Sequence, residues 1–156
     1  MKTIFKSDIT DAFKRIGLQK GDSVMVHTSL GKIGYVCGGA QAVIEALTEV
    51  VGEDGTIMMP TQSWKNLDPE TGVHWDADEA DWDSIRENWP AYNKTITPTN
   101  TMGAVAEMFR SWPGAVRSDH PARYQIIYRL EIKLFRQINT LLPKPISQGH
   151  FDQLLS

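Results

Sequence analysis

The chain has 156 residues, of which 41% are hydrophobic and 22% charged, values typical of one soluble globular domain with a sizeable core. The net charge of −3 gives no overall basic surface for nucleic acid, and no apolar run approaches the ~20 residues needed to span a bilayer. Cys37 is the sole cysteine and no secretory signal is recognisable, so we expect a cytoplasmic protein without an internal disulfide that binds neither nucleic acid nor membrane.

The first part of the chain alternates helical and strand patterns. Residues 9–16 and 43–51 show apolar side chains at helical spacing, and a glycine follows each of these stretches. Residues 23–27 and 56–59 are short apolar strands. Since strand, helix and strand in this order predict a parallel pair, we expect an α/β fold: a layered mixed or parallel sheet with flanking helices.

A polar loop follows the first strand. Three successive apolar residues at 24–26 predict a strand buried on both faces, and hydroxyls and glycines then continue to a helix that begins near Ala40. Backbone N–H groups, the Thr28 and Ser29 hydroxyls and the positive helix end would face one crevice, which is typical of an anion or cofactor site. The glycine spacing matches neither the Walker loop nor the dinucleotide fingerprint.

Other chemistries are less well supported. Ser29 lacks the Gly-x-Ser-x-Gly context of a hydrolase nucleophile, so we interpret it as a binding group. His27, at the end of an apolar strand, is by default a core histidine with a hydrogen-bond partner. The histidines and Cys37 are too scattered for metal ligation, and we expect no metal.

Residues 61–92 lose periodicity and carry four of the five tryptophans. Seven carboxylates and no basic residue lie between Lys65 and Arg86. Two interpretations remain open with about equal weight: a solvated acidic loop whose tryptophans fold back on the core, or a wall that attracts a polycationic ligand.

The remaining chain is predicted to contain two more helices. Residues 102–109 form an amphipathic helix, and a polar loop at 117–121 follows it. In that loop Arg117 suits an anionic group or a structural salt bridge equally well. Residues 124–142 have apolar residues every three or four positions and a net basic charge, and they predict one long amphipathic helix.

Several motifs together resemble the aminoglycoside 3-N-acetyltransferase family, in order and spacing, up to about Pro121. They are Val26-His27-Thr28-Ser29-Leu30-Gly31-Lys32-Ile33-Gly34 with Gly38-Gly39, Met59-Pro60-Thr61, Ile85-Arg86-Glu87, Pro90-Ala91-Tyr92, Thr97-Pro98-Thr99, Met102-Gly103, Phe109-Arg110 and Arg117-Ser118-Asp119-His120-Pro121. Each motif alone is weak, whereas the set is specific. The pyrophosphate loop of the Gcn5-related acetyltransferases is absent from the sequence.

The resemblance implies an enzyme that transfers an acetyl group from acetyl-coenzyme A to the 3-amino group of an aminoglycoside antibiotic, the reaction of antibiotic resistance. The residues that it places along the coenzyme A path are Thr28, Ser29, Leu30, Lys32, Ile33, Gly34, Thr61, Arg117 and Ser118. The residues that it places toward the aminoglycoside are Trp64, Asp76, Asp78, Trp82 and Glu87.

The chain departs from the family pattern after residue 123. Family members are nearly twice as long, and their general-base histidine lies in the second half. Here Arg123-Tyr124-Gln125-Ile126-Ile127 replaces the next family segment. We therefore expect residues 1–123 to be the N-terminal part of an acetyltransferase domain and 124–156 to be an unmatched basic tail produced by a frameshift or truncation.

The departure leads to two expectations about function. The chain is a truncated, weakly active or inactive acetyltransferase, or else a non-catalytic coenzyme A-binding half-domain that needs a partner chain. In either case, loss of half a fold predicts self-association through exposed apolar faces.

Overall fold

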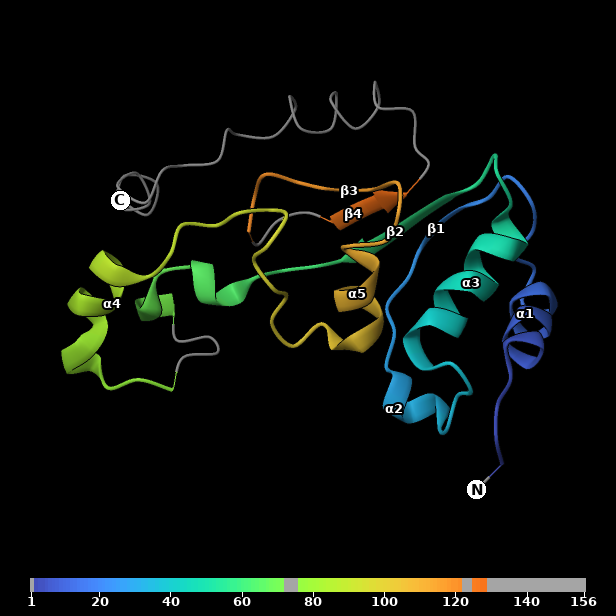
Figure 1. The fold of residues 1–156 in the computed structure, drawn as a ribbon, viewed down its shortest axis with the longest axis horizontal. Helices are drawn as coiled ribbons and strands as arrows, with labels where there is room; N and C mark the ends of the chain where they lie inside the picture. Colours follow the sequence, from blue (N-terminus) through green and yellow to red (C-terminus); the bar gives the residue numbers. More distant parts are fainter. Residues whose placement is uncertain (1, 72–75, 122–124, 129–156) are drawn as a thin grey trace.

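The computed structural model describes residues 2–71, 76–121 and 125–128, which form a mixed α/β structure (Figure 1). Its elements in chain order are α1 (Lys6–Arg15), β1 (Ser23–Met25), α2 (Leu30–Ile33), α3 (Gly39–Val51), β2 (Thr56–Pro60), the 3-10 helices η1 (Trp64–Asn66), η2 (Pro69–Thr71) and η3 (Glu79–Asp81), α4 (Trp82–Asn88), α5 (Gly103–Phe109), β3 (Ala115–Arg117) and β4 (Gln125–Tyr128).

The strands form one sheet in the order β1-β2-β4-β3. β1 and β2 are parallel, from the pair Ser23–Thr56 to the pair Met25–Met58, and β4 runs antiparallel to both β2 and β3. The predicted parallel pair around a helix and the mixed sheet are confirmed. Pro60, which has no N–H for the ladder, stands at the last position of β2 opposite Gln125.

The core lies on one face of this sheet. Ile57 and Met59 of β2 are 0% and 1% exposed and pack against α3 and α5, which lie below the strands in the view of Figure 1. α3 buries eight of its residues, and α1 covers its outer side. Alternation along β2 therefore directs every second residue into a shared core with both helices.

Both ends of α1 are determined locally. The N-cap is Phe5, two residues before Ser7 and three before Asp8, the predicted caps, and the Asp8 carboxylate accepts the Phe5 N–H at 2.9 Å. Gly17, at φ +95°, follows the helix as expected.

Three predictions about elements are wrong. β1 is not buried on both faces: it is an edge strand that ends at Met25, and Ser23 and Met25 are exposed. The polar loop contains the helical turn α2, and residues 82–88 form the helix α4 in a segment where no periodicity was visible. Short elements of this kind bury too few apolar residues to leave a clear periodic pattern.

The predicted helix at 124–142 is also contradicted at its start, because residues 125–128 form β4. β-Branched and aromatic residues favour a strand here, and β4 completes the ladders of β2 and β3. The remainder of that predicted helix lies outside the described residues.

Candidate functional site

An open groove with a volume of about 1070 Å³ lies between α1 and the segment that follows β1. Thr28, Ser29 and Ile33 line one side of it. Lys2, Lys14 and Arg15 contribute basic groups, Asp8 and Asp11 contribute carboxylates, and Ile9, Phe13, Val26 and Val43 are the apolar lining residues. A groove that combines apolar side chains, hydroxyls and charged groups of both signs suits a long ligand with apolar and polar parts.

The loop along this groove is shaped by its backbone. Ser29 is the N-cap of α2 without using its hydroxyl as a cap, and its carbonyl accepts the Lys32 N–H at 2.9 Å. Gly34 and Gly38 have φ values of +108° and +82°, which favour glycine, and a Cβ on Gly38 would lie 3.1 Å from the Ala42 Cβ. The glycines therefore permit the tight path from α2 into α3.

The predicted loop residues differ in their environment. Leu30 is half-buried and packs against the core. Ser29, Lys32 and Ile33 are exposed, and Gly34 is half-buried. His27 is also exposed, so the interpretation of it as a core histidine is wrong, because β1 lies at the edge of the sheet.

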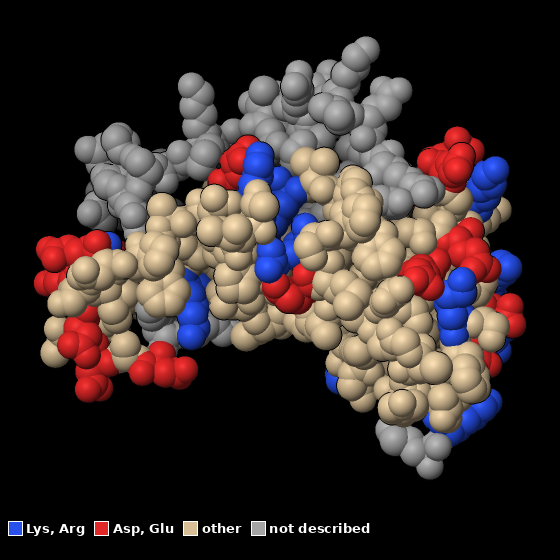
Figure 2. Space-filling view, viewed as in Figure 1, with Lys and Arg blue, Asp and Glu red and all other residues tan. Residues whose placement is uncertain are grey.

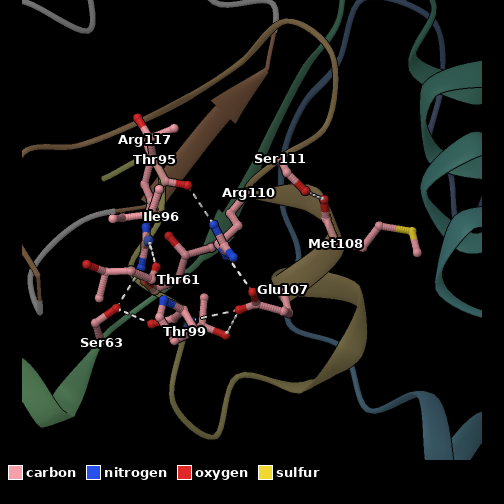
Figure 3. Close-up of polar contacts among 12 residues, drawn as sticks. Thr61, Ser63, Thr95, Ile96, Thr99, Glu107, Met108, Arg110, Ser111 and Arg117 are labelled. Carbon is pink, nitrogen blue, oxygen red and sulfur yellow. Dashed lines mark hydrogen bonds and ion pairs between the residues drawn. The ribbon is translucent and has the colours of Figure 1, made fainter. Parts of the chain in front are cut away.

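The other predicted cofactor residues gather around a buried arginine. Arg117 is 4% exposed, and its guanidinium donates to the Thr61 carbonyl at 2.6 Å and the Ser63 hydroxyl at 2.8 Å (Figure 3). It also donates to the carbonyls of Thr97 and Lys94. These bonds tie β3 to the end of β2 and to the segment before α5.

The guanidinium of Arg117 is partly desolvated. Burial lowers the pKa of its guanidinium, and the Tyr92 ring lies 5.2 Å from its Cζ atom. Burial likewise raises the pKa of the Tyr92 hydroxyl, which donates to the Ser118 carbonyl at 3.0 Å. Carbonyl oxygens around a guanidinium compensate its burial, since arginine stays charged.

Thr61 and Ser118 belong to the same buried cluster. Thr61 is 1% exposed, and its hydroxyl has no hydrogen-bond partner within the part of the chain that the structure describes. Ser118 is also 1% exposed, and its hydroxyl donates to the His120 carbonyl at 3.3 Å. The described residues that line the groove include none of Thr61, Arg117 and Ser118, so the structure does not bring the two predicted sets together there.

A second polar cluster adjoins Arg117 and escaped the sequence analysis. The Glu107 carboxylate accepts the Thr99 N–H at 2.7 Å and the Thr99 hydroxyl at 2.8 Å, and it pairs with Arg110 (Figure 3). Arg110 also donates to the Thr95 carbonyl at 2.9 Å. The i,i+3 spacing of Glu107 and Arg110 was the available signal.

The acidic segment is partly neutralised within itself. Arg86 pairs with Asp68 at 2.9 Å, Asp83 at 2.7 Å and Glu70 at 3.5 Å. The Arg86 hydrogen bonds are the main cause that lowers the Asp68 pKa. Figure 2 shows Asp and Glu side chains gathered at the end of the molecule that carries α4.

The residues predicted to face the aminoglycoside lie in this segment. Asp76, Asp78 and Glu87 are exposed, whereas Trp64 and Trp82 are half-buried. The Trp82 indole nitrogen is buried and without a hydrogen-bond partner among the described residues. Both interpretations of the segment keep support, since some carboxylates form internal ion pairs and others face solvent.

Within the described ranges, no group of three or more His, Cys, Asp or Glu side chains is arranged to hold a metal ion. No helix there is long and apolar enough to cross a membrane.

Comparison with known proteins places the chain in a protein family of α/β architecture. A model of the aminoglycoside 3-N-acetyltransferase family matches residues 25–123. The chain belongs to that family, as the motifs predict.

Individual relatives support the assignment over the same region. The SPbeta prophage-derived aminoglycoside N(3')-acetyltransferase-like protein YokD of Bacillus subtilis is 51% identical over 117 residues, 74% of this chain and 43% of its own. Aminoglycoside N(3)-acetyltransferase IX of Micromonospora chalcea is 41% identical over 118 residues, 74% of this chain and 39% of its own. The chain thus spans about two fifths of the length of these relatives.

Solved structures confirm the fold class. The crystal structure of YokD superposes with a TM-score of 0.75 at 47% identity, covering 80% of this chain and 50% of that one. AAC-VIa bound to sisomicin gives 0.67 at 32% identity, covering 81% and 46%. AAC-IIIb in a binary complex with CoASH gives 0.68 at 22% identity, covering 86% and 49%, which bears on the fold alone.

Proposed function

We propose that this chain carries the coenzyme A-binding part of an acetyl-coenzyme A-dependent aminoglycoside 3-N-acetyltransferase. The observation that carries the proposal is the groove along Thr28, Ser29 and Ile33, because these residues belong to the family motif within the matched region 25–123. In the groove, hydroxyls would bond the pantetheine amides, and the apolar lining residues would contact its methylene groups. Lys2, Lys14 and Arg15 offer charge to phosphates.

Arg117 and Ser118 do not line the groove, and their role is to position neighbouring segments. Their buried hydrogen bonds hold the segment 92–100 and the end of β2, so we assign them a positioning role while any contact with coenzyme A stays a prediction. Contact between Thr61 and coenzyme A is likewise a prediction. The buried Thr61 hydroxyl lacks a partner among the described residues and is chemically able to bond a ligand that reaches it.

The acceptor side is assigned to the acidic segment. Aminoglycosides are polycations at neutral pH, and exposed carboxylates at Asp76, Asp78 and Glu87 would raise their local concentration. Trp64 and Trp82 would contribute ring faces. The sisomicin complex of AAC-VIa, a relative in fold and sequence, supports an aminoglycoside as the ligand class.

Acetyl transfer also requires a general base. The amine nitrogen attacks the thioester carbonyl carbon, the carbon–sulfur bond breaks, and coenzyme A leaves as the thiol, but a base must first take the ammonium proton. The resemblance locates that histidine in the half of the family fold beyond the matched region. We therefore propose that the 156-residue chain by itself binds coenzyme A without measurable acetyl transfer, as a truncated copy or as a half-domain that pairs with another polypeptide.

Isothermal titration calorimetry with coenzyme A tests the binding proposal. We expect saturable binding that Thr28→Val with Ser29→Ala weakens about tenfold, as the loss of one or two ligand hydrogen bonds implies. Ser111→Ala is the matched control: it removes an exposed hydroxyl just after α5 that donates to the Met108 carbonyl, and it should bind like the unaltered chain. Absence of heat with a folded chain would overturn the assignment.

A further inference from the structure

A short stretch of backbone, residues 97–103, here called the joining segment, connects the buried Arg117 cluster with the wall of the groove. At its first end, Arg117 donates to the Thr97 carbonyl, and the Ser63 hydroxyl donates to the Pro98 carbonyl at 2.6 Å. Both donors are buried side chains, so these bonds are shielded from competing water. The first end of the joining segment is therefore fixed to the end of β2 and to β3.

The middle of the joining segment is docked on the chain that follows β2. The Asn100 N–H donates to the Gln62 carbonyl at 2.8 Å, and the Asn100 side-chain oxygen accepts the Lys65 N–H at 3.0 Å. One residue that both donates and accepts is held in distance and in orientation. A shift of the joining segment would therefore break hydrogen bonds at several points.

The far end of the joining segment lies against the Thr28 backbone. An added Cβ on Gly103, the first residue of α5, would lie 3.9 Å from the Thr28 carbonyl oxygen, which is van der Waals contact. α2 and α5 also contact each other, and Thr28 and Ser29 line the groove. Because closely packed backbones cannot move independently, the position of Gly103 limits where Thr28 can lie.

The backbone of the joining segment is strained at one residue. Thr101 has a φ of +61°, and among the described residues every other positive φ belongs to a glycine. A β-branched residue in the left-handed region is unfavourable and persists only where surrounding contacts hold it there. The joining segment therefore needs strong anchors close to Thr101.

Glu107 supplies the anchor that connects the joining segment to the core. Its carboxylate accepts the Thr99 N–H at 2.7 Å and the Thr99 hydroxyl at 2.8 Å (Figure 3). Hydrogen bonds to an ionised acceptor are about twice as strong as neutral ones. Glu107 lies on α5, whose Val105 and Phe109 are fully buried in the core. The two bonds therefore fix the joining segment relative to the core helix that begins at Gly103.

We propose that Glu107 is a positioning residue for coenzyme A binding: through Thr99 it holds the joining segment against Thr28 and thereby fixes the Thr28–Ser29 wall of the groove. Glu107 is not among the described residues that line the groove, so it acts through these other residues. Its role in ligand binding rests on the proposed function. The coupling of Glu107 to Thr28 is a property of the chain without ligand and can be measured there.

Amide and carbonyl NMR of the full, ligand-free chain tests the coupling. Glu107→Gln keeps the shape of the side chain but removes the charge that strengthens both Thr99 bonds, so we expect the signals of residues 28–30 to shift. Signals of α1, on the opposite side of the groove, should stay in place. Unshifted signals at residues 28–30 would overturn the proposal.

Two variants of Thr99 form a matched pair that changes less of the fold. Thr99→Val has nearly the same shape and lacks the hydroxyl that donates to Glu107, whereas Thr99→Ser keeps it. We expect Thr99→Val to shift the signals of residues 28–30 and Thr99→Ser to leave them unchanged. Equal shifts in both variants would contradict the proposal, and this pair decides the question if Glu107→Gln does not fold.

Two glycines of nearly equal backbone conformation separate the contact at Thr28 from a general loss of stability. Gly103 and Gly21 have φ values of +85° and +88°, so an alanine is similarly strained at both positions. An added Cβ meets the Thr28 carbonyl at Gly103 and nothing within 4 Å at Gly21. We expect Gly103→Ala, and not Gly21→Ala, to shift the signals of residues 28–30. Equal shifts in both variants would mean that these signals report stability alone and would overturn the proposal.

Calorimetry with coenzyme A then measures the consequence for binding. We expect Glu107→Gln to weaken coenzyme A binding about fivefold, as is common for residues that act through others, and Thr99→Ser to bind like the unaltered chain. Glu53→Gln, which also removes one carboxylate but at an exposed position outside the groove, is the control and should bind normally. Unchanged affinity of Glu107→Gln would refute the positioning role. If the unaltered chain shows no binding, the proposed function fails and the positioning role in coenzyme A binding fails with it, while the NMR shifts of the ligand-free chain still report the coupling.

Discussion

At the scale of single residues, Arg117 shows how a residue identified for ligand binding is used by the fold. Its guanidinium is buried and donates to Thr61, Ser63, Thr97 and Lys94. From the sequence alone, an anion site and a structural role for Arg117 are equally open. The bonds favour the structural role, because a guanidinium surrounded by carbonyl oxygens has few donors left for a ligand.

Arg117→Met should therefore destabilise the fold. The substitution leaves buried carbonyl oxygens without donors, and we expect a loss of about 3 kcal/mol in the free energy of unfolding. Urea denaturation followed by circular dichroism measures it. Lys20→Met, which removes an exposed cation 4.0 Å from Asp54, should change stability by less than about 0.5 kcal/mol. Equal stability of the two variants would refute the structural role.

Glu107 gives a pH-dependent prediction. Burial opposes its ionisation, but the Thr99 bonds and Arg110 outweigh burial and hold its pKa below the ordinary 4.5. A lowered pKa in the folded state means that the carboxylate stabilises the fold fully above about pH 4.5 and loses this effect as the pH falls through the folded value. Glu107→Gln should thus be less stable than the parent at pH 7, and the difference should shrink below pH 4.5. A difference that is constant from pH 3 to pH 7 would argue against the cluster.

At the scale of elements, the turn between α3 and β2 fixes the parallel pair. Gly55 lies against the last turn of α3, where an added Cβ would come within 2.5 Å of the Val51 Cβ and carbonyl oxygen. Gly55→Ala must therefore separate α3 from β2, and we expect a loss of about 2 kcal/mol. Gly31→Ala, where nothing lies within 4 Å, is the control. Thermal melts of both variants distinguish a steric effect from a general effect of replacing glycine.

The same scale shows how far the sequence determines the fold. Long stretches with clear periodicity, α1, α3, β2 and α5, were predictable because each buries one regular stripe. α2, α4 and β4 were not, since their form depends on distant partners; β4 is a strand because β2 and β3 present free edges to it. For the site, the motif predicted Thr28 and Ser29 at a groove, whereas burial of Arg117 and Thr61 depends on tertiary packing.

At the scale of the whole molecule, the chain contains a region that matches the family and shares less than half of its relatives' length. The match covers residues 25–123, and the relatives are more than twice as long as the part they share with this chain. We expect no turnover in a coupled assay of thiol release with a 3-amino aminoglycoside and acetyl-coenzyme A. Release of one thiol per acetylated product, with product confirmed by mass spectrometry, would show that the chain holds its own base.

The central claim is that coenzyme A binds along the loop from Thr28 to Gly34. Backbone amide NMR during a coenzyme A titration tests it residue by residue in the full chain. We predict the largest shifts at residues 28–34, in α1 and at the start of α3. No shift at residues 28–34 at saturating coenzyme A would contradict the account.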